Sequence, residues 1–350
     1  MKMPLLRHCL LSGVVLLLAF LLVACDAAEK ELPVLRLQGE TMGTTWHVTV
    51  PGINTEDKVS SLQAGITSVL KQVNAQMSTW QSDSELSLFN QHQGTDWFPV
   101  SSELVKVVTA AQEISALSGG VYDITVGPLV NLWGFGPSEH EQATPSEAEI
   151  QATLARVGYS KLEVRQRPTA LRKRLPELYV DLSSIAKGFG ADRVALFLDE
   201  KGLADYLVEI GGEIRAKGVS QRGDVWRIAI EKPMDFGRAV QQGIQLKDQG
   251  LATSGDYRNF FTENGKRYSH TLNPLTGNPV QHSLASVSVA ASDTMTADAY
   301  ATLLMALGDE RGREFADQHQ LNAFFIIRTD KGFETYATEG FKPLLIAADS

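Results

Sequence analysis

One stretch of the sequence restricts the fold more than any other: residues 179–192, which read Tyr-Val-Asp-Leu-Ser-Ser-Ile-Ala-Lys-Gly-Phe-Gly-Ala-Asp. Its mostly apolar start predicts the end of a short strand over 179–182. Ser183 then predicts a helix N-cap. The helix that follows has apolar side chains on more than one face, which indicates that it is buried. A strand that leads directly into a buried helix is a favourable place for a ligand.

Two glycines in this helix indicate that something approaches it closely. Gly188 and Gly190 lower helix propensity, and the usual reason for such residues is a nearby ligand or another backbone segment. The free amides of the first helical turn could receive a phosphate, and Lys187 would add a positive charge beside them. The alternative is a structural helix in which Asp181 and Lys187 are solvated. The stretch alone leaves both interpretations open.

Length and charge limit the kinds of function. The 350 residues suffice for one elaborate domain or two ordinary ones. The formal charge of −9 becomes about −11 when Lys2 and Arg7 of the N-terminal leader are set aside. Such an acidic chain argues against nucleic acid as a partner.

The N-terminal residues resemble a bacterial lipoprotein signal. Two basic residues precede an apolar run over 10–23 that ends in small residues and a cysteine. We therefore expect a signal peptide over residues 1–24, a lipidated Cys25 as the mature N-terminus, and a tether over 25–33. An uncleaved transmembrane helix is the alternative, but the run is short for a span. Asp26 resembles the signal that retains lipoproteins in the inner membrane, so we expect a lipid-anchored protein on its periplasmic side.

Cysteine chemistry is excluded from the mature domain. The sequence holds two cysteines, Cys9 in the leader and Cys25 at the expected lipidation site. The folded part therefore has no disulfide, no thiolate zinc site and no cysteine nucleophile. Any metal must be held by oxygen atoms or by histidine.

The remaining periodicity predicts an α+β fold with mostly antiparallel strands and interleaved helices. Helices are expected over 59–77, 102–117 with Ser102 as N-cap, 146–157 and 294–307. Strands are expected over 35–37, 46–50, 206–210, 214–218, 226–230, 244–246, 251–253, 268–272, 284–290, 323–328 and 334–336. Residues 120–136 predict a loop folded against the core, and the basic residues 165–174 predict a solvated surface loop.

An acid and a hydroxyl on the last predicted helix form a candidate metal site. Asp298 and Thr302 are four residues apart, so both project from one face of the helix. A carboxylate with a hydroxyl suits magnesium, a hard cation that keeps waters and shares its shell with substrate phosphates. Taken alone, such a pair is more often a surface acid and a threonine bonded to its own backbone. The flanking alanines favour a closely packed face.

A histidine stands where a predicted strand meets an Asn-Pro turn. His270 is followed by Thr-Leu-Asn-Pro-Leu-Thr-Gly over residues 271–277. At such a corner a histidine can act as a base or bind phosphate, and it can equally be a structural residue. The pair Gly211-Gly212 before Glu213 predicts only a turn between two strands.

Residues 180–188, Val-Asp-Leu-Ser-Ser-Ile-Ala-Lys-Gly, are very similar to the signature of the ApbE family, the FAD:protein FMN transferases. Seven further blocks resemble segments of that family in the family's order: residues 41–44, 77–80, 122–129, 211–212, 252–255, 270–277 and 297–302. Any one block is weak evidence, whereas eight in order are specific. The resemblance implies one ApbE-like domain over residues 34–350, with a mixed α+β fold that resembles the T-fold.

The family binds FAD in an elongated cleft and uses magnesium. By resemblance, the residues that contact FAD are Met42, Trp80, Val121, Tyr122, Asp123, Asp181, Lys187 and Leu272. Magnesium would be held by Ser184, through its backbone carbonyl, with Asp298 and Thr302. Two positions depart from the family pattern, since Trp80 stands where tyrosine is common and Asn273 where aspartate is common. Trp80 keeps a stacking surface, whereas Asn273 lacks the charge.

The reaction that the resemblance implies joins FMN through a phosphoester bond to a threonine or serine hydroxyl of a target protein and releases AMP. The hydroxyl attacks the flavin-side phosphorus of FAD, and magnesium neutralises charge on the pyrophosphate. Lys187 would stabilise phosphate charge, and His270 is the candidate general base or phosphate contact. The expected acceptors are periplasm-facing, flavin-carrying subunits of sodium-translocating NADH:quinone reductase or Rnf complexes.

Two other functions fit the same residues. A magnesium-dependent FAD pyrophosphatase would use water in place of the protein hydroxyl, and FMN would then end free in solution. A noncatalytic FAD-binding lipoprotein would bind FAD without turnover. Loss of activity without loss of FAD binding in Asp298→Ala would argue against this last function.

Overall fold

The computed structural model describes residues 32–347, except 54–55, 138–141, 235–236, 238 and 258. The expected signal peptide over 1–24, Cys25 and the tether as far as residue 31 lie outside the described residues. Within the described ranges, no helix combines the length and the apolar character that a membrane crossing requires.

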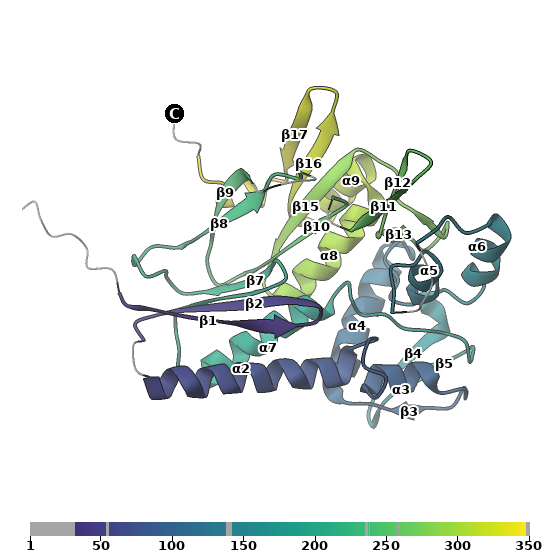
Figure 1. The fold of residues 1–350 in the computed structure, drawn as a ribbon, viewed down its shortest axis with the longest axis horizontal. Helices are drawn as coiled ribbons and strands as arrows, with labels where there is room; N and C mark the ends of the chain where they lie inside the picture. Colours follow the sequence, from purple (N-terminus) through teal and green to yellow (C-terminus); the bar gives the residue numbers. More distant parts are fainter. Residues whose placement is uncertain are drawn as a thin grey trace, which may run out of the picture.

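A central sheet of eight strands organises the molecule (Figure 1). Every pair of neighbouring strands in it is antiparallel. In spatial order the strands are β1 (Val34–Thr41), β2 (Thr44–Pro51), β6 (Tyr206–Ile210), β7 (Glu213–Lys217), β10 (Gly250–Gly255), β15 (Leu284–Ala291), β16 (Asn322–Thr329) and β17 (Gly332–Ala337). Several neighbours are distant in sequence, so segments far apart along the chain meet in the sheet.

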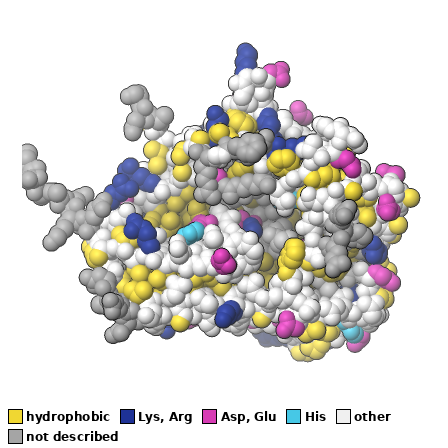
Figure 2. Space-filling view, viewed as in Figure 1, with side chains coloured by type: hydrophobic (Ala, Val, Ile, Leu, Met, Phe, Trp, Pro, Cys, Tyr) yellow, Lys and Arg dark blue, Asp and Glu magenta, His cyan; other side chains and the backbone are white. Residues whose placement is uncertain are grey.

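Helices cover one face of the sheet, and a hairpin covers part of the other. The covering helices are α2 (Glu56–Met77), α7 (Ala186–Glu200), α8 (Thr294–Leu307) and α9 (Asp309–Gln318). Apolar side chains of α2 and α7 share a core with β1, β2 and β6, and those of α8 and α9 share one with β10, β15 and β16. The hairpin of β8 (Trp226–Glu231) and β9 (Val240–Leu246) packs its apolar side chains with those of β10 and β16. Basic and acidic side chains are interspersed over the face shown in Figure 2.

A second group of elements packs beside the ends of α2 and α8. It is built on α4 (Ser102–Leu117), with a small sheet in the order β3 (Phe98–Pro99), β5 (Thr169–Lys173) and β4 (Leu162–Gln166). Its core continues through residues 178–189 into the first turn of α7 and along one side of α8, so these segments join the two groups. The other elements here are α3 (Glu85–Gln91), α5 (Gly127–Leu132), α6 (Glu147–Leu154) and η1 (Tyr159–Lys161). Four short strands and a turn complete the described chain: β11 (Phe260–Glu263), β12 (Lys266–Ser269), β13 (Leu272–Asn273), β14 (Asn278–Pro279) and η2 (Lys342–Leu344).

The predicted α+β fold with mostly antiparallel strands is confirmed, and two of its helices have the predicted ends. The N-cap of α4 was assigned one residue late. Ser101, in extended conformation, accepts a hydrogen bond from the backbone N–H of Leu104, and Ser102 is already helical. The helices α3, α5 and α9 and the strand β11 were not predicted, and α5 lies within residues 120–136, for which a loop was predicted.

The prediction of a solvated loop over 165–174 is wrong. These residues belong to β4 and β5, which form a hairpin. Lys173 is buried, because its ammonium group donates to the carbonyl oxygens of Asn90 and Pro176. Leu171 is buried in the core next to α4. One acceptor is local and one comes from a distant segment, and together they satisfy a charge whose surrounding composition indicated a surface.

The predicted strand over 179–182 and the N-cap at Ser183 are also wrong. Residues 178–182 join no sheet, and the helix α7 begins at Ala186. Both the N–H and the hydroxyl of Ser183 donate to one carboxylate oxygen of Asp181. This local turn occupies the serine, so it does not cap the helix. The predicted burial of the helix is confirmed.

Candidate active site

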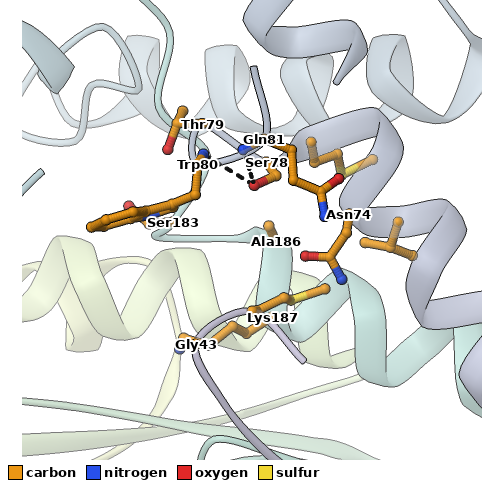
Figure 3. Close-up of a pocket in the computed structure, with 12 residues that line it drawn as sticks. Gly43, Asn74, Ser78, Thr79, Trp80, Gln81, Ser183, Ala186 and Lys187 are labelled. Carbon is orange, nitrogen blue, oxygen red and sulfur yellow. Dashed lines mark hydrogen bonds between the residues drawn. The ribbon is translucent and has the colours of Figure 1, made fainter. Parts of the chain in front are cut away.

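A cavity of about 650 Å³ opens between the tip of the β1–β2 hairpin, the end of α2 and the start of α7. Figure 3 shows Asn74, Gln81 and Trp80 on one side of it and Lys187 with Gly43 on the other. Trp80 is 72% exposed, so the ring forms an open edge of the cavity. Three of the residues predicted to contact FAD, Met42, Trp80 and Lys187, therefore line one space.

The hairpin tip has a backbone that places Met42 on the wall of the cavity. Met42 has φ +51° and Gly43 has φ +70°, so two successive residues adopt the left-handed conformation. The end of the Met42 side chain reaches α7, and a Cβ atom at Gly190 would lie 3.1 Å from its Cε atom. The glycine thus leaves room for the methionine to pack across the helix.

The helices α7 and α8 meet with almost no space between them. A Cβ atom at Gly188 would lie 2.4 Å from the carbonyl oxygen of Thr294 and 2.8 Å from Cβ of Asp298. The backbone N–H of Gly188 donates to Oδ2 of Asp298 at 2.9 Å. Asp192 accepts the N–H groups of Thr294 and Met295, which fixes the start of α8 on α7. The close approach predicted at Gly188 is therefore made by another backbone segment.

A phosphate was predicted to bind the free N–H groups at the first turn of α7, but protein acceptors already bind most of these groups. The N–H of Ala186 donates to the carbonyl oxygen of Leu182, and that of Gly188 donates to Asp298. A phosphate near this turn would therefore depend mainly on side chains, above all on Lys187.

Three charged side chains meet at this junction. Nζ of Lys187 lies 2.6 Å from Oε1 of Glu213 and 4.0 Å from Oδ1 of Asp298. Burial raises the pKa of both carboxyl groups, against the opposing effect of the Lys187 charge. Burial alone would lower the pKa of Lys187, but the carboxylates of Asp298 and Glu213 outweigh it and raise that pKa. Lys187 therefore stays protonated at neutral pH, beside two buried acids.

Asp298 is the one charged residue among the three predicted metal ligands. The carboxylate is 4% exposed, and among the described residues no donor is hydrogen-bonded to its Oδ1. Thr302 lies one turn further along α8, with its hydroxyl 3.5 Å from that of Ser254. The hydroxyl of Ser184 is 2.9 Å from that of Tyr122. Burial raises the pKa of Tyr122, and the negative charge of Asp298 acts in the same direction.

This donor set fits a hard divalent cation that completes its shell with water or phosphate oxygens. One carboxylate and neutral oxygens are too few for a cage made by protein alone, and magnesium is usually bound in this way. In the part of the chain that the structure describes, no three His, Cys, Asp or Glu side chains form a metal-binding group. The carboxylate of Asp298 would therefore supply the negative charge that holds a metal at this place.

Several predicted FAD contacts lie deeper in the protein than the cavity wall. Val121, Asp123 and Leu272 are buried. Asp123 uses both carboxylate oxygens internally, for Thr125 and for the backbone N–H of Tyr159. Asp181 is also buried, and its Oδ1 accepts from the neighbouring Ser183, as described above. Contact of these residues with FAD stays a prediction.

His270 lies beyond β12, and one of its ring nitrogens is already bonded. Nδ1 is 3.0 Å from the carbonyl oxygen of Asn259, and the ring packs edge-on to Phe135. Burial lowers the pKa of His270, and the charge of Lys187 acts in the same direction. At neutral pH the imidazole is therefore uncharged, with Nε2 free of any hydrogen bond to the described residues.

The sequence analysis missed Glu213, the most buried acid of this site. It follows two glycines with φ +59° and +106°, and it is the first residue of β7. The turn was predicted, but its inward-facing acid was not. Alternation along β7 does not indicate it, because Arg215 and Lys217 on the same face of the strand are also charged, and both are only half-buried. Asn74, Gln81 and Ser183, which line the cavity, were not predicted either.

Comparisons with known proteins find relatives over nearly the whole chain. The model of the ApbE family matches residues 42–325. An FAD:protein FMN transferase of Vibrio cholerae is 46% identical over 337 residues, which cover 95% of this chain and 99% of that protein. The solved structure of the flavin transferase ApbE from Vibrio cholerae matches with a TM-score of 0.82 and 46% identity, over 90% of this chain and all of that one. The apo form of the flavinyl transferase ApbE of Pseudomonas stutzeri matches with a TM-score of 0.81 and 37% identity, over 91% and 99% of the two chains. The chain belongs to the ApbE family.

Proposed function

We propose that this protein is an FAD:protein FMN transferase that requires Mg²⁺ and releases AMP. The observation that carries the proposal is the junction of Lys187 with the buried Asp298, beside a cavity of about 650 Å³ that Lys187 lines. Relatives that are identical at 38% to 46% of positions over nearly the full chain bear this name. The cavity offers space for a dinucleotide, and Lys187 and Asp298 offer charges that can bind its phosphates and a metal.

The cavity walls would bind FAD through rings and charge. Trp80 offers an exposed aromatic face for a flavin or adenine ring, and Met42 offers a flexible apolar contact opposite it. The ammonium of Lys187 has donors beyond the one directed at Glu213, and these can meet phosphate oxygens. These residues orient the dinucleotide, with its pyrophosphate towards the start of α8.

Asp298, Thr302 and the backbone carbonyl of Ser184 would hold Mg²⁺. When bound, the metal supplies positive charge that neutralises the pyrophosphate and orients it for in-line displacement. A threonine or serine hydroxyl of the acceptor forms the new bond to the flavin-side phosphorus, and the bond to AMP breaks on the opposite side. His270 can take the hydroxyl proton on Nε2, because its lowered pKa keeps the imidazole neutral.

The leader sequence supports the proposed location, and the family resemblance supports the proposed acceptors. A signal peptide over residues 1–24 and a lipidated Cys25 would anchor the enzyme on the periplasmic side of the inner membrane. Flavin-carrying subunits of sodium-translocating NADH:quinone reductase or Rnf complexes are the proposed acceptors. Anchoring both proteins to one membrane raises their effective concentration towards each other.

Intact-mass measurement of an acceptor tests the function directly. The purified protein is incubated with FAD, Mg²⁺ and a periplasmic flavin-carrying domain of such a complex. We expect the acceptor to gain the mass of FMN less water, and we expect EDTA to abolish the gain. An unmodified acceptor with free FMN and AMP in solution would instead identify an FAD pyrophosphatase. FAD that stays bound and intact would identify a binding protein without turnover.

A further inference from the structure

Glu213 is the buried acid for which the proposed reaction has no role. The residue is 3% exposed, and its Oε1 lies 2.6 Å from Nζ of Lys187. Its Oε2 is buried and has no hydrogen-bond partner among the residues that the structure describes. A carboxylate oxygen buried without a donor is costly, so its presence calls for an explanation.

The turn before Glu213 fits both the acid and the stem of the lysine. Gly211 and Gly212 have φ +59° and +106°, conformations that residues with a side chain rarely adopt. A Cβ atom at Gly211 would lie 2.8 Å from the Thr44 side chain and 3.4 Å from Cδ of Lys187. The glycine turn therefore lets the Lys187 stem pass and points Glu213 at its ammonium group.

The two acids compete for one ammonium group. Nζ of Lys187 is in hydrogen-bond contact with Glu213 but stands 4.0 Å from Oδ1 of Asp298. If Glu213 carried no charge, Asp298 would be the nearest remaining counter-charge. An ammonium group on Oδ1 would occupy the oxygen that a divalent cation needs. It would also repel that cation strongly, because charges a few Å apart in a poorly hydrated site interact strongly.

We propose that Glu213 is a positioning residue that draws the Lys187 ammonium away from Asp298 and so keeps this carboxylate free for a divalent cation. The inference rests on the proposed metal site. It explains why a second acid is buried beside the lysine and why that acid has few other donors. It also leaves the remaining protons of Lys187 directed towards the cavity, where the phosphates of a dinucleotide would lie.

Binding of Mn²⁺ alone tests this inference without turnover. Free Mn²⁺ is measured by electron paramagnetic resonance during titration of the purified protein, in the absence of FAD. We expect Glu213→Gln to raise the dissociation constant for Mn²⁺ by about 10- to 100-fold. We expect the double variant Glu213→Gln with Lys187→Met to recover most of this loss, because the competing cation is gone. A merely structural role of Glu213 would not be reversed by a second substitution.

Two controls separate the ways in which the inference can fail. Lys187→Met alone is expected to bind Mn²⁺ at least as tightly as the wild type, and weaker binding would overturn the inference even if Glu213→Gln does not fold. If the wild type binds Mn²⁺ but Glu213→Gln binds it equally well, Glu213 has no such role and the metal site stands. If the wild type binds no better than Asp298→Asn, the proposed metal site is itself wrong and the inference falls with it.

Discussion

The loop that holds Asp123 and the junction of α7 with α8 each bury an aspartate, and they use it in opposite ways. Burial raises the pKa of both carboxyl groups. Asp123 accepts three hydrogen bonds, two from Thr125 and one from Tyr159. Asp298 accepts one among the described residues, from the N–H of Gly188. Burial and charge are thus similar, and the free acceptor capacity of Asp298 is what distinguishes a carboxylate open to a ligand from a structural one.

The largest effect on turnover is expected from removing the charge of Asp298, the aspartate with free acceptor capacity. Asp298→Asn keeps the shape of the side chain and an acceptor for the N–H of Gly188, but it loses the charge that would hold a divalent cation. We expect transferase turnover to fall by about 10²- to 10³-fold while FAD binding is retained. Intact mass of the acceptor gives turnover, and quenching of flavin fluorescence gives binding. Turnover close to that of the wild type would mean that the metal lies elsewhere.

A pH titration of activity tests whether His270, like Asp298, is a group that takes part in the reaction. A general base works when neutral, so activity is present above its pKa and is lost as the pH falls through it. Because burial lowers the pKa of His270 from its usual value of 6.5, we expect activity to fall only below pH 6.5. His270→Ala should lower turnover by about 10²-fold and remove this acidic limb. Initial rates across the acidic and neutral range check both, and a midpoint above 6.5 would exclude the assignment.

Two glycines of α7 give a matched pair for the contact between α7 and α8. In Gly188→Ala the new methyl group meets the backbone of Thr294 and the Cβ of Asp298, so the helices must separate. We expect a loss of about 1–3 kcal/mol of unfolding free energy and roughly tenfold lower turnover. In Gly190→Ala the methyl group meets the flexible end of Met42, and the loss should be smaller. Urea denaturation and turnover of both variants check this, and equal losses would contradict the geometry.

The smallest effect on turnover is expected from a substitution at Asp123, whose carboxylate is fully bonded within the protein. In Asp123→Asn an amide NH₂ group replaces one of the acceptor oxygens and faces a protein donor. We expect a loss of about 1–3 kcal/mol of unfolding free energy, with turnover per folded molecule within a few fold of the wild type. Urea denaturation and a Mg²⁺ titration of turnover test it. A changed Mg²⁺ requirement would erase the distinction between the two aspartates.

The predictable parts of the fold were those with strong local signals. The helix α8 has the predicted ends because Asp293 caps its start and Gly308, with φ +84°, ends it. Sequence reasoning failed where distant groups decide. The buried ammonium group of Lys173 donates to the nearby carbonyl oxygen of Pro176, but its other acceptor is the carbonyl oxygen of Asn90, which is distant in the sequence.

For the site, local patterns predicted less than the family resemblance did. The spacing of Asp298 and Thr302 suggested one helix face, but no local pattern shows that this face meets Lys187. That meeting depends on the contact of α7 with α8, whose residues are far apart in the sequence. Glu213 was missed for the same reason, because its inward orientation follows from a strand pairing that the turn alone does not show.

The residues of the site are synthesised at different times, because they lie far apart along the chain. The tip of the β1–β2 hairpin, the segment after α2 and the helix α7 leave the ribosome before α8, and they carry Met42, Trp80 and Lys187. Asp298 follows only with α8, after β15, the strand that joins β10 to the C-terminal hairpin. Contacts between such distant segments form late in folding. A prematurely ended chain therefore has the residues that line the cavity but lacks the acid that would hold a metal, and we expect it to leave FAD intact.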